Sequence, residues 1–399
     1  MKARAVDSLS HILLFCILLI SFTRVVPYLP ALPDAFYYGT FMAALLWMVF
    51  QGGFVFSYIW LPFLIAIFLS VIVNDIPTYF QVGFRIIAFL AVTFVVGPFL
   101  INPIMVIWRR LLFVHSLTFI RWIVIFSFLA WIIKPDLVNG KSGFEGFTNQ
   151  SMLLGLLSGI SFIYSLYRFY LSSQFIGRYL EAGIAIASFV ILILAGSRSA
   201  LGSTMLAAVF FYSRIYRYQV MRLGRVFFTV LCLAVLTSGI WWSYTERLRE
   251  KMENGEKGGS ITKSRDGLWE DRMDEFKAFP FFGVGFAAIN MKYSDEGLKS
   301  NKANSGTIEP GSSWLFLLSS MGLAGFLSFF IPFFRILYLL FTKESVGLNG
   351  YFLGSLLFLF LFHLFFEGYI VASGAYLCLF LWLLLSECGK IVNINNRLI

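Results

Sequence analysis

Arg198 lies between two long apolar stretches, in the segment Gly196-Ser197-Arg198-Ser199. A charged side chain in such a place is costly unless it has a specific partner. Backbone amides at the start of the next helix, which Ser199 could cap, also attract anions. A guanidinium beside a helix N-terminus is therefore a good phosphate site. The alternative is an arginine that extends to lipid headgroups, and the residues alone leave both interpretations open.

Acid–base chemistry could come from Glu309, which lies in the polar segment 309–313 ahead of an apolar run. A carboxylate there can act as a general base if a partner tunes its pKa. The alternative is an acidic residue that stabilises the start of a helix. Arg85, His363 and Glu367 lie near the ends of other apolar runs, and ionisable residues there are functional candidates by default. We expect these three to join Arg198 around one cavity.

A third polar region runs from Ser264 to Gly285. The spacing of Trp269 and Phe276 predicts a short amphipathic helix that lies on the membrane domain, with Asp266 as its N-cap. Arg265 would then precede the helix and could face the site, although a solvated loop charge is the simpler interpretation. Further upstream, the segment 143–151 predicts a tight turn, with Asn149 or Ser151 as a helix cap.

The composition decides which class of protein positions these residues. Of 399 residues, 59% are hydrophobic and only 13% are charged, whereas a soluble domain carries about 25% charge. This excludes a disordered chain, a disulfide scaffold and a conventional soluble enzyme. We therefore expect an all-α, polytopic integral membrane protein with a single membrane domain over residues 1–399.

Scanning for apolar runs predicts about twelve spans. They cover residues 9–26, 36–50, 54–73, 80–101, 111–133, 151–170, 180–196, 199–213, 226–243, 312–334, 350–366 and 369–386. Lys and Arg cluster in short connections such as Trp108-Arg109-Arg110. The positive-inside rule then predicts that both termini are cytoplasmic and that residues 244–311 form a periplasmic or extracellular loop. The same rule explains the net charge of +10, so the basic residues do not indicate a nucleic-acid-binding protein.

Several ordered motifs in this sequence resemble the O-antigen ligase and O-antigen polymerase (Wzy-type) family of polytopic membrane glycosyltransferases. They are Gly146-Phe147-Thr148-Asn149, Gly196-Ser197-Arg198-Ser199-Ala200, Arg265-x-x-Leu268-Trp269, Pro280-x-x-Gly283-x-Gly285, and a helix start with Leu315, Leu318, Gly322 and Gly325. The resemblance covers roughly residues 140 to 330.

The resemblance implies a polyprenyl-diphosphate-linked sugar donor, with transfer to a hydroxyl on the outer face of the membrane. Outer-face arginines bind the donor diphosphate in this family, which implies that role for Arg198 and Arg265, with Arg85 as a third candidate. Two fixed guanidinium groups can stabilise a diphosphate leaving group without a metal, so no metal or cofactor is expected. The supporting residues in the matching segments are Asn149, Ser197, Ser199, Trp269, Gly283, Gly285, Ser312 and Ser313.

The sequence departs from the family at one position. Ligases carry a His-Asn pair at the head of the loop-to-helix element, where this chain has Gly311 and Ser312, and residues 244–311 contain no histidine. Glu309 is the expected substitute base, with His363 and Glu367 in reserve. This form is closer to exopolysaccharide or capsule repeat-unit polymerases.

We therefore expect a polymerase of undecaprenyl-diphosphate-linked oligosaccharide repeat units in the cytoplasmic (inner) membrane. The lipid-linked oligosaccharide would be both donor and acceptor, and the bilayer would be a further partner. The candidate protein partners are a chain-length regulator and a flippase of the same pathway. The nearest alternative is an O-antigen ligase that transfers a finished chain to a lipid-core or protein acceptor. A transporter or flippase of lipid-linked sugars is a third, but it requires repeat symmetry that the sequence does not show.

Overall fold

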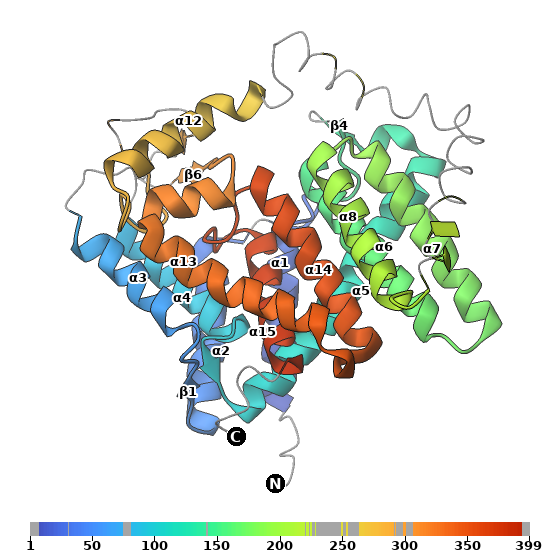
Figure 1. Cartoon of the computed structure of the whole chain (residues 1–399), viewed down its shortest axis with the longest axis horizontal. Coiled ribbons are helices and arrows are strands. Elements are labelled where there is room, and N and C mark those ends of the chain that lie inside the picture. Colours follow the sequence, from blue (N-terminus) through green and yellow to red (C-terminus); the bar gives the residue numbers. More distant parts are fainter. Residues whose placement is uncertain are drawn as a thin grey trace.

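The computed structural model describes residues 8–30, 32–74, 81–140, 143–219, 221–222, 224–225, 228, 249, 253, 263–290, 292, 298–300 and 306–392. Within these residues the protein is built from helices (Figure 1). They are α1 (Ser8–Thr23), α2 (Asp34–Gln51), α3 (Leu61–Ile72), α4 (Val82–Val96), α5 (Pro103–Ile133), α6 (Ser151–Leu171), α7 (Phe175–Leu194), α8 (Arg198–Ile215), α12 (Lys263–Ala278), α13 (Ser313–Thr342), α14 (Gly347–Phe366) and α15 (Tyr376–Ile391).

The strands among the described residues are short and form three antiparallel pairs. These are β1 (Val55–Phe56) with β2 (Leu100–Ile101), β3 (Asn139–Gly140) with β4 (Gly143–Phe144), and β5 (Leu298–Ser300) with β6 (Gly306–Ile308). Two 3-10 turns, η1 (Pro135–Leu137) and η3 (Glu344–Val346), complete the connections.

Five of the described helices are long and apolar enough to cross a membrane, which fits an all-α, multi-pass membrane protein. They lie at Pro103–Ile133, Ser151–Leu171, Phe175–Leu194, Ser313–Thr342 and Glu344–Phe366, and shorter apolar helices lie at Leu9–Thr23, Leu61–Ile72 and Val82–Val96. The count of twelve spans is not confirmed. Apart from residue 228, the predicted span at 226–243 lies outside the described residues, and so do parts of the predicted loop at 244–311.

The predicted start of α5 was wrong. The helix begins at Pro103, after an Asn102 side chain that accepts a hydrogen bond from the Ile104 amide, so Arg109 lies inside a helix and not in a connection. Arg109 is 2% exposed and donates to the carbonyls of Phe94 and Val95 at 2.9 and 2.7 Å. Carbonyls in the last turn of a helix lack intrahelical partners, so this arginine satisfies the end of α4.

The helices that carry the candidate residues run in alternating directions. In Figure 1, α14 lies between α13 and α8, and α12 lies across one end of the bundle, beside α13. A Cβ added to Gly354 of α14 would meet the ring of Phe210, and one added to Gly159 would meet both Thr204 and Leu359. Residue numbers therefore rise along α8 as they fall along α14. The first turn of α8 lies beside the last turn of α14, at the end of the bundle that we call the α12 end.

A kink in α13 holds the segment 280–285 at this end. Gly322 has φ 63° and ψ −164°, which breaks the helix. The amides of Leu323 and Ala324 donate to the carbonyls of Pro280 and Phe281, at 2.8 and 3.1 Å.

The helix carbonyls freed by the kink, those of Ser319 and Ser320, accept from the amides of Val284 and Gly285 at 2.9 Å each. The segment therefore replaces two helical hydrogen bonds with four of its own, because buried backbone groups must be paired. Gly283, with φ 69°, leaves no room for a Cβ against this backbone. Gly283 and Gly285 thus have a structural role in joining the α12 region to α13.

Candidate functional site

The centre of the candidate site is an ion pair between α12 and the end of α14. Arg265 Nη2 lies 2.5 Å from Glu367 Oε1, and the two side chains are 20% and 19% exposed. Arg265 Nη1 donates to the Gly311 carbonyl at 3.0 Å. The helix α12 begins at Lys263, so the predicted Asp266 cap was wrong and Arg265 lies within the first turn. The guanidinium is therefore fixed by a carboxylate and a backbone carbonyl.

The same face of α12 binds the loop ahead of α13. Arg265, Leu268 and Trp269 are three and four residues apart, which places them on one side of a helix. Trp269 Nε1 also donates to the Gly311 carbonyl, at 3.2 Å. Gly311 has φ 71°, and a Cβ on it would lie 3.0 Å from the Leu268 Cβ. Glycine is thus required where α12 approaches this loop.

Aromatic rings enclose this side of the site. The Trp269 ring centre lies 6.3 Å from those of both Phe365 and Phe366, at the end of α14. Trp314, in the first turn of α13, lies 5.6 Å from Phe365. These contacts hold α12 against the two helix ends that carry the polar residues.

Ser312 and Ser313 join the start of α13 to the end of α14. The Ser312 side chain caps α13 by accepting from the Leu315 amide at 3.4 Å. Ser313 donates to the Glu367 carbonyl through its amide at 3.1 Å and its Oγ at 2.7 Å. Its Oγ also accepts from the Tyr369 amide at 2.9 Å. The backbone of Glu367 is therefore held on both sides, which fixes where its carboxylate points.

His363 lies behind Glu367 and is 1% exposed. Its Nδ1 is 3.0 Å from the Tyr369 hydroxyl, and its Nε2 is buried with no hydrogen-bond partner among the described residues. It lies close enough to Arg265 to interact electrostatically. Because the imidazole is enclosed by protein, it is better placed to orient its neighbours than to contact a substrate.

The second carboxylate of the site is Glu309, which is exposed. It lies close enough to Glu367 to interact electrostatically with it. Burial raises the pKa of the Glu367 carboxyl above its usual range, and the charge of Glu309 raises it further, although the Arg265 guanidinium opposes both. A carboxyl with a raised pKa accepts a proton near neutral pH more readily than an ordinary one.

Arg198 is the first residue of α8, so it lies at the α12 end of the bundle, as the Arg265–Glu367 pair does. The cap of α8 is Ser197, which accepts from the Ala200 amide at 3.4 Å, and not Ser199 as predicted. The Ser199 hydroxyl lies 3.4 Å from that of Ser197. The start of α8 therefore offers a guanidinium and helix amides at the same end as Arg265.

Asn149 does not cap α6. The cap position is Gln150, which makes no side-chain capping bond, and Ser151 is the first helical residue. Asn149 instead donates through its side chain to the Arg24 carbonyl at 3.2 Å, and its amide donates to the Val25 carbonyl at 3.1 Å. Its observed contacts are with the segment that follows α1, which ties the turn before α6 to that segment.

Arg85, in the first turn of α4, lies against the segment that follows α12. Its Nη1 donates to the Ala287 carbonyl at 3.1 Å, where Ala287 has φ 50°. This contact shows a role in fixing the segment 283–290. Its assignment to a diphosphate stays a prediction.

A buried ion pair within α12 was missed from the sequence. Arg272 Nη1 lies 2.9 Å from Glu275 Oε2, and the side chains are 1% and 0% exposed. Glu275 Oε1 accepts from the Asn290 amide at 2.8 Å. Burial raises the pKa of Glu275 and lowers that of Arg272. The i, i+3 spacing of an arginine and a glutamate on a predicted helix was the available signal.

No group of three or more His, Cys, Asp and Glu side chains suited to a metal ion lies within the described part of the chain. The polar residues gathered at the α12 end instead suit an anion and a proton acceptor. Arginines at two helix starts, Arg198 and Arg265, can bind phosphate oxygens, and Glu309 and Glu367 can accept a proton.

One comparison with known proteins finds a similarity to a family over part of the chain. Residues 183–330, a little over a third of the chain, match the family model described as O-Antigen ligase. No curated protein matches the chain. The matched region contains Arg198, Arg265, Gly283 and Gly285, whereas Glu367 and His363 lie beyond it. The match agrees with the resemblance predicted from the motifs that lie within residues 183–330, and this region of the protein is similar to the O-antigen ligase family.

Proposed function

We propose that this protein polymerises polyprenyl-diphosphate-linked oligosaccharide repeat units for a surface polysaccharide. The family match supports a membrane glycosyltransferase that acts on lipid-linked sugars. The polymerase reaction, the undecaprenyl carrier and the outer face of the cytoplasmic membrane are our inference from the motifs and the charge pattern.

The observation that carries the proposal is the contact between Arg265 and the Glu367 carboxylate at 2.5 Å. A carboxylate held by an arginine occupies the position that a phosphate oxygen would take. A diphosphate carries more charge than one carboxylate, and a second arginine, Arg198, lies at the same end of the bundle. We infer that the donor diphosphate displaces Glu367 from Arg265.

The displaced carboxylate then has a chemical role. An acceptor sugar hydroxyl attacks the anomeric carbon of the donor while the bond from that carbon to the diphosphate oxygen breaks. The bonding electrons leave with the diphosphate, whose growing negative charge Arg265 and Arg198 stabilise. The hydroxyl proton passes to Glu367, which has lost its cationic partner. A single displacement of this kind inverts the anomeric centre, by analogy with inverting glycosidases.

Glu367 is a better base than the other two candidates on this geometry. It is partly exposed, its backbone is fixed by Ser313, and its pKa is already raised. His363 is enclosed behind Tyr369 and orients this side of the site. Glu309 is exposed and lies near Glu367, where its charge favours proton uptake by Glu367.

The position of the missing ligase histidine supports the polymerase over the ligase. Gly311 stands there, and its carbonyl accepts hydrogen bonds from both Arg265 and Trp269. A side chain at this position would meet Leu268 at 3.0 Å. This close contact and the positive φ of Gly311 both disfavour a catalytic side chain here. A ligase that transfers a finished chain to another acceptor remains the second candidate, because it would use the same donor site.

The test uses purified protein in nanodiscs with a polyprenyl-diphosphate oligosaccharide. We expect a ladder of longer lipid-linked chains, abolished by Arg265→Ala and by Arg198→Ala. Arg178→Ala is the matched control, since the side chain of this exposed arginine of α7 donates to the Ser172 carbonyl and, within the described residues, to no residue of the candidate site. Transfer that occurs only with a foreign acceptor would identify a ligase. No transfer with either acceptor would overturn the glycosyltransferase proposal.

A further inference from the structure

An apolar groove lies on the surface formed by α8, α13 and α14. Its volume is about 420 Å³. It is lined by Phe210, Phe334, Leu337, Tyr338, Phe341 and Phe358. Tyr338 is 66% exposed and Phe341 is 48% exposed, so the groove opens to the outside of the protein. Because α13 and α14 are long enough to span a membrane, this outside is the bilayer.

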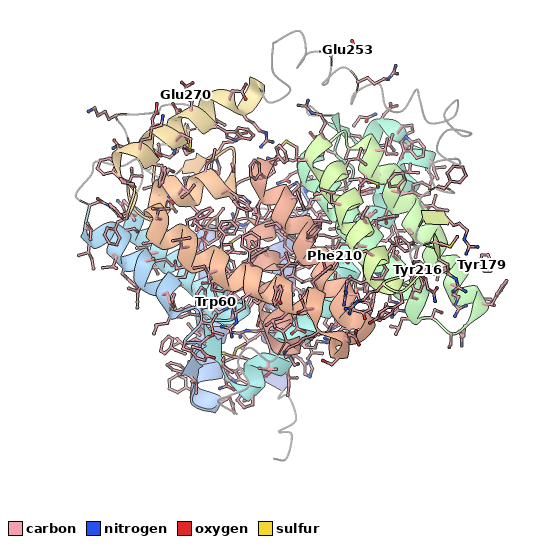
Figure 2. The ribbon with its side chains drawn as sticks, viewed as in Figure 1. Trp60, Tyr179, Phe210, Tyr216, Glu253 and Glu270 are labelled. Atoms are coloured by element: carbon pink, nitrogen blue, oxygen red, sulfur yellow. The ribbon has the colours of Figure 1, made fainter. Side chains whose placement is uncertain are left out.

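A buried arginine lies at one end of the groove. Arg214 is in the last turn of α8, four residues after Phe210, and therefore on the same face of the helix. Figure 2 shows Phe210 where the green α8 meets the orange helices. Arg214 is 4% exposed, and its Nε and Nη2 have no hydrogen-bond partner among the described residues. Its Cζ lies 4.9 Å from the ring centre of Phe341, which lines the groove, and 5.1 Å from that of Tyr351.

The charged residues beside Arg214 are mostly basic. Arg217 and Lys343 follow on the ends of α8 and α13. Among the described residues, the acidic group Glu344 lies nearby, and it is engaged by Arg217 at 2.9 Å and by the Tyr218 hydroxyl at 2.6 Å. This end of α8 is opposite to the end that carries Arg198, so the groove is separate from the candidate active site.

We propose that this groove and Arg214 bind a glycerophospholipid with an anionic headgroup. One acyl chain lies along the phenylalanines, and a phosphate oxygen accepts from Nε and Nη2 of Arg214. The headgroup is anionic because no ammonium group in it offsets the phosphate charge that Arg214 binds. The Phe341 ring covers the guanidinium and is half exposed, so rotation of this ring opens Arg214 to the groove. A buried guanidinium with unused N–H groups is costly, and a phosphate at the end of an apolar groove removes that cost.

The proposal does not depend on the glycosyltransferase reaction. The purified full chain in detergent is titrated with phosphatidylglycerol or phosphatidylcholine, and bound lipids are counted by native mass spectrometry. We expect a preference for phosphatidylglycerol of about fivefold, the size expected for one arginine near an anionic headgroup. Arg214→Gln should remove that preference, whereas Arg178→Gln should keep it. Inorganic phosphate should not compete, because it lacks the acyl chain.

A second variant keeps the test decisive if Arg214→Gln does not fold. Leu337→Trp fills the groove without changing the arginine and should also lower the number of bound lipids. Three results would overturn the proposal: no preference in the wild type, a preference retained by Arg214→Gln, or full competition by inorganic phosphate. A dimer that Leu337→Trp disrupts would also overturn it, since the groove would then be a protein interface.

Discussion

Arg265 and Glu367 are 102 residues apart in the sequence, and their side chains meet at 2.5 Å. Each comes from a different helix end, and Ser313 of a third helix fixes the backbone of Glu367. The pair joins α12 to the start of α13 and the end of α14, so its loss should affect both folding and activity.

We expect Arg265→Ala to lower kcat at least about a hundredfold, the usual cost of removing one group that stabilises a developing charge. It should also lower the free energy of unfolding by about 1.5–3 kcal/mol, because it removes a hydrogen bond to a charged group. Turnover of the lipid-linked donor and thermal unfolding in detergent measure the two effects. The exchange Arg265→Glu with Glu367→Arg provides the control: stability should partly return and activity should not. Recovery of activity would show that the pair is only structural.

The pH dependence follows from the raised pKa of Glu367. The carboxyl must lose its proton before it can act as a base, so kcat/KM should rise with pH through that raised pKa. The rise should thus lie above the ordinary glutamate value of about 4.3. Glu367→Gln should abolish the rise together with most of the activity. Glu309→Gln removes a negative charge beside Glu367 and should therefore shift the rise to lower pH. An unchanged profile in Glu309→Gln would exclude the coupling between the two carboxyls.

The kink in α13 gives a prediction about stability. Gly322→Ala places a Cβ against the backbone of Phe281 in a conformation with φ 63°, so it should destabilise the protein by about 1–3 kcal/mol. The loss of segment 280–285 should also displace α12 and lower activity. Gly202→Ala in α8 is the control, because open space surrounds that position and alanine favours a helix. Melting temperatures in one detergent compare the two, and equal values would show that the backbone junction is unimportant.

Hydrophobic patterns predicted much of the helical framework but not the contacts between its ends. The expected spans at 151–170 and 350–366 agree closely with α6 and α14, because long apolar runs have few alternatives in a membrane. The start of α5 was missed because a basic residue such as Arg109 is typical of a loop between two spans. In the structure Arg109 lies inside the helix and binds carbonyls at the end of α4. Glu367 was named as a candidate, but nothing local in the sequence indicates that it faces Arg265. That contact depends on how α12 folds back over two helix ends.

The buried pair of Arg272 and Glu275 provides the last prediction. It tests whether the charged residues of α12 serve the fold or the reaction. Both side chains are at most 1% exposed, so removal of one partner leaves a buried charge unpaired. Arg272→Met alone should cost about 3–5 kcal/mol, whereas Arg272→Met with Glu275→Leu should regain most of that stability. If the pair serves only to hold α12 on α13, the double variant should also regain chain elongation, which Arg265→Ala cannot do. Unfolding and elongation assays on the same preparations make the comparison. Full stability without activity in the double variant would place Arg272 or Glu275 in the reaction itself.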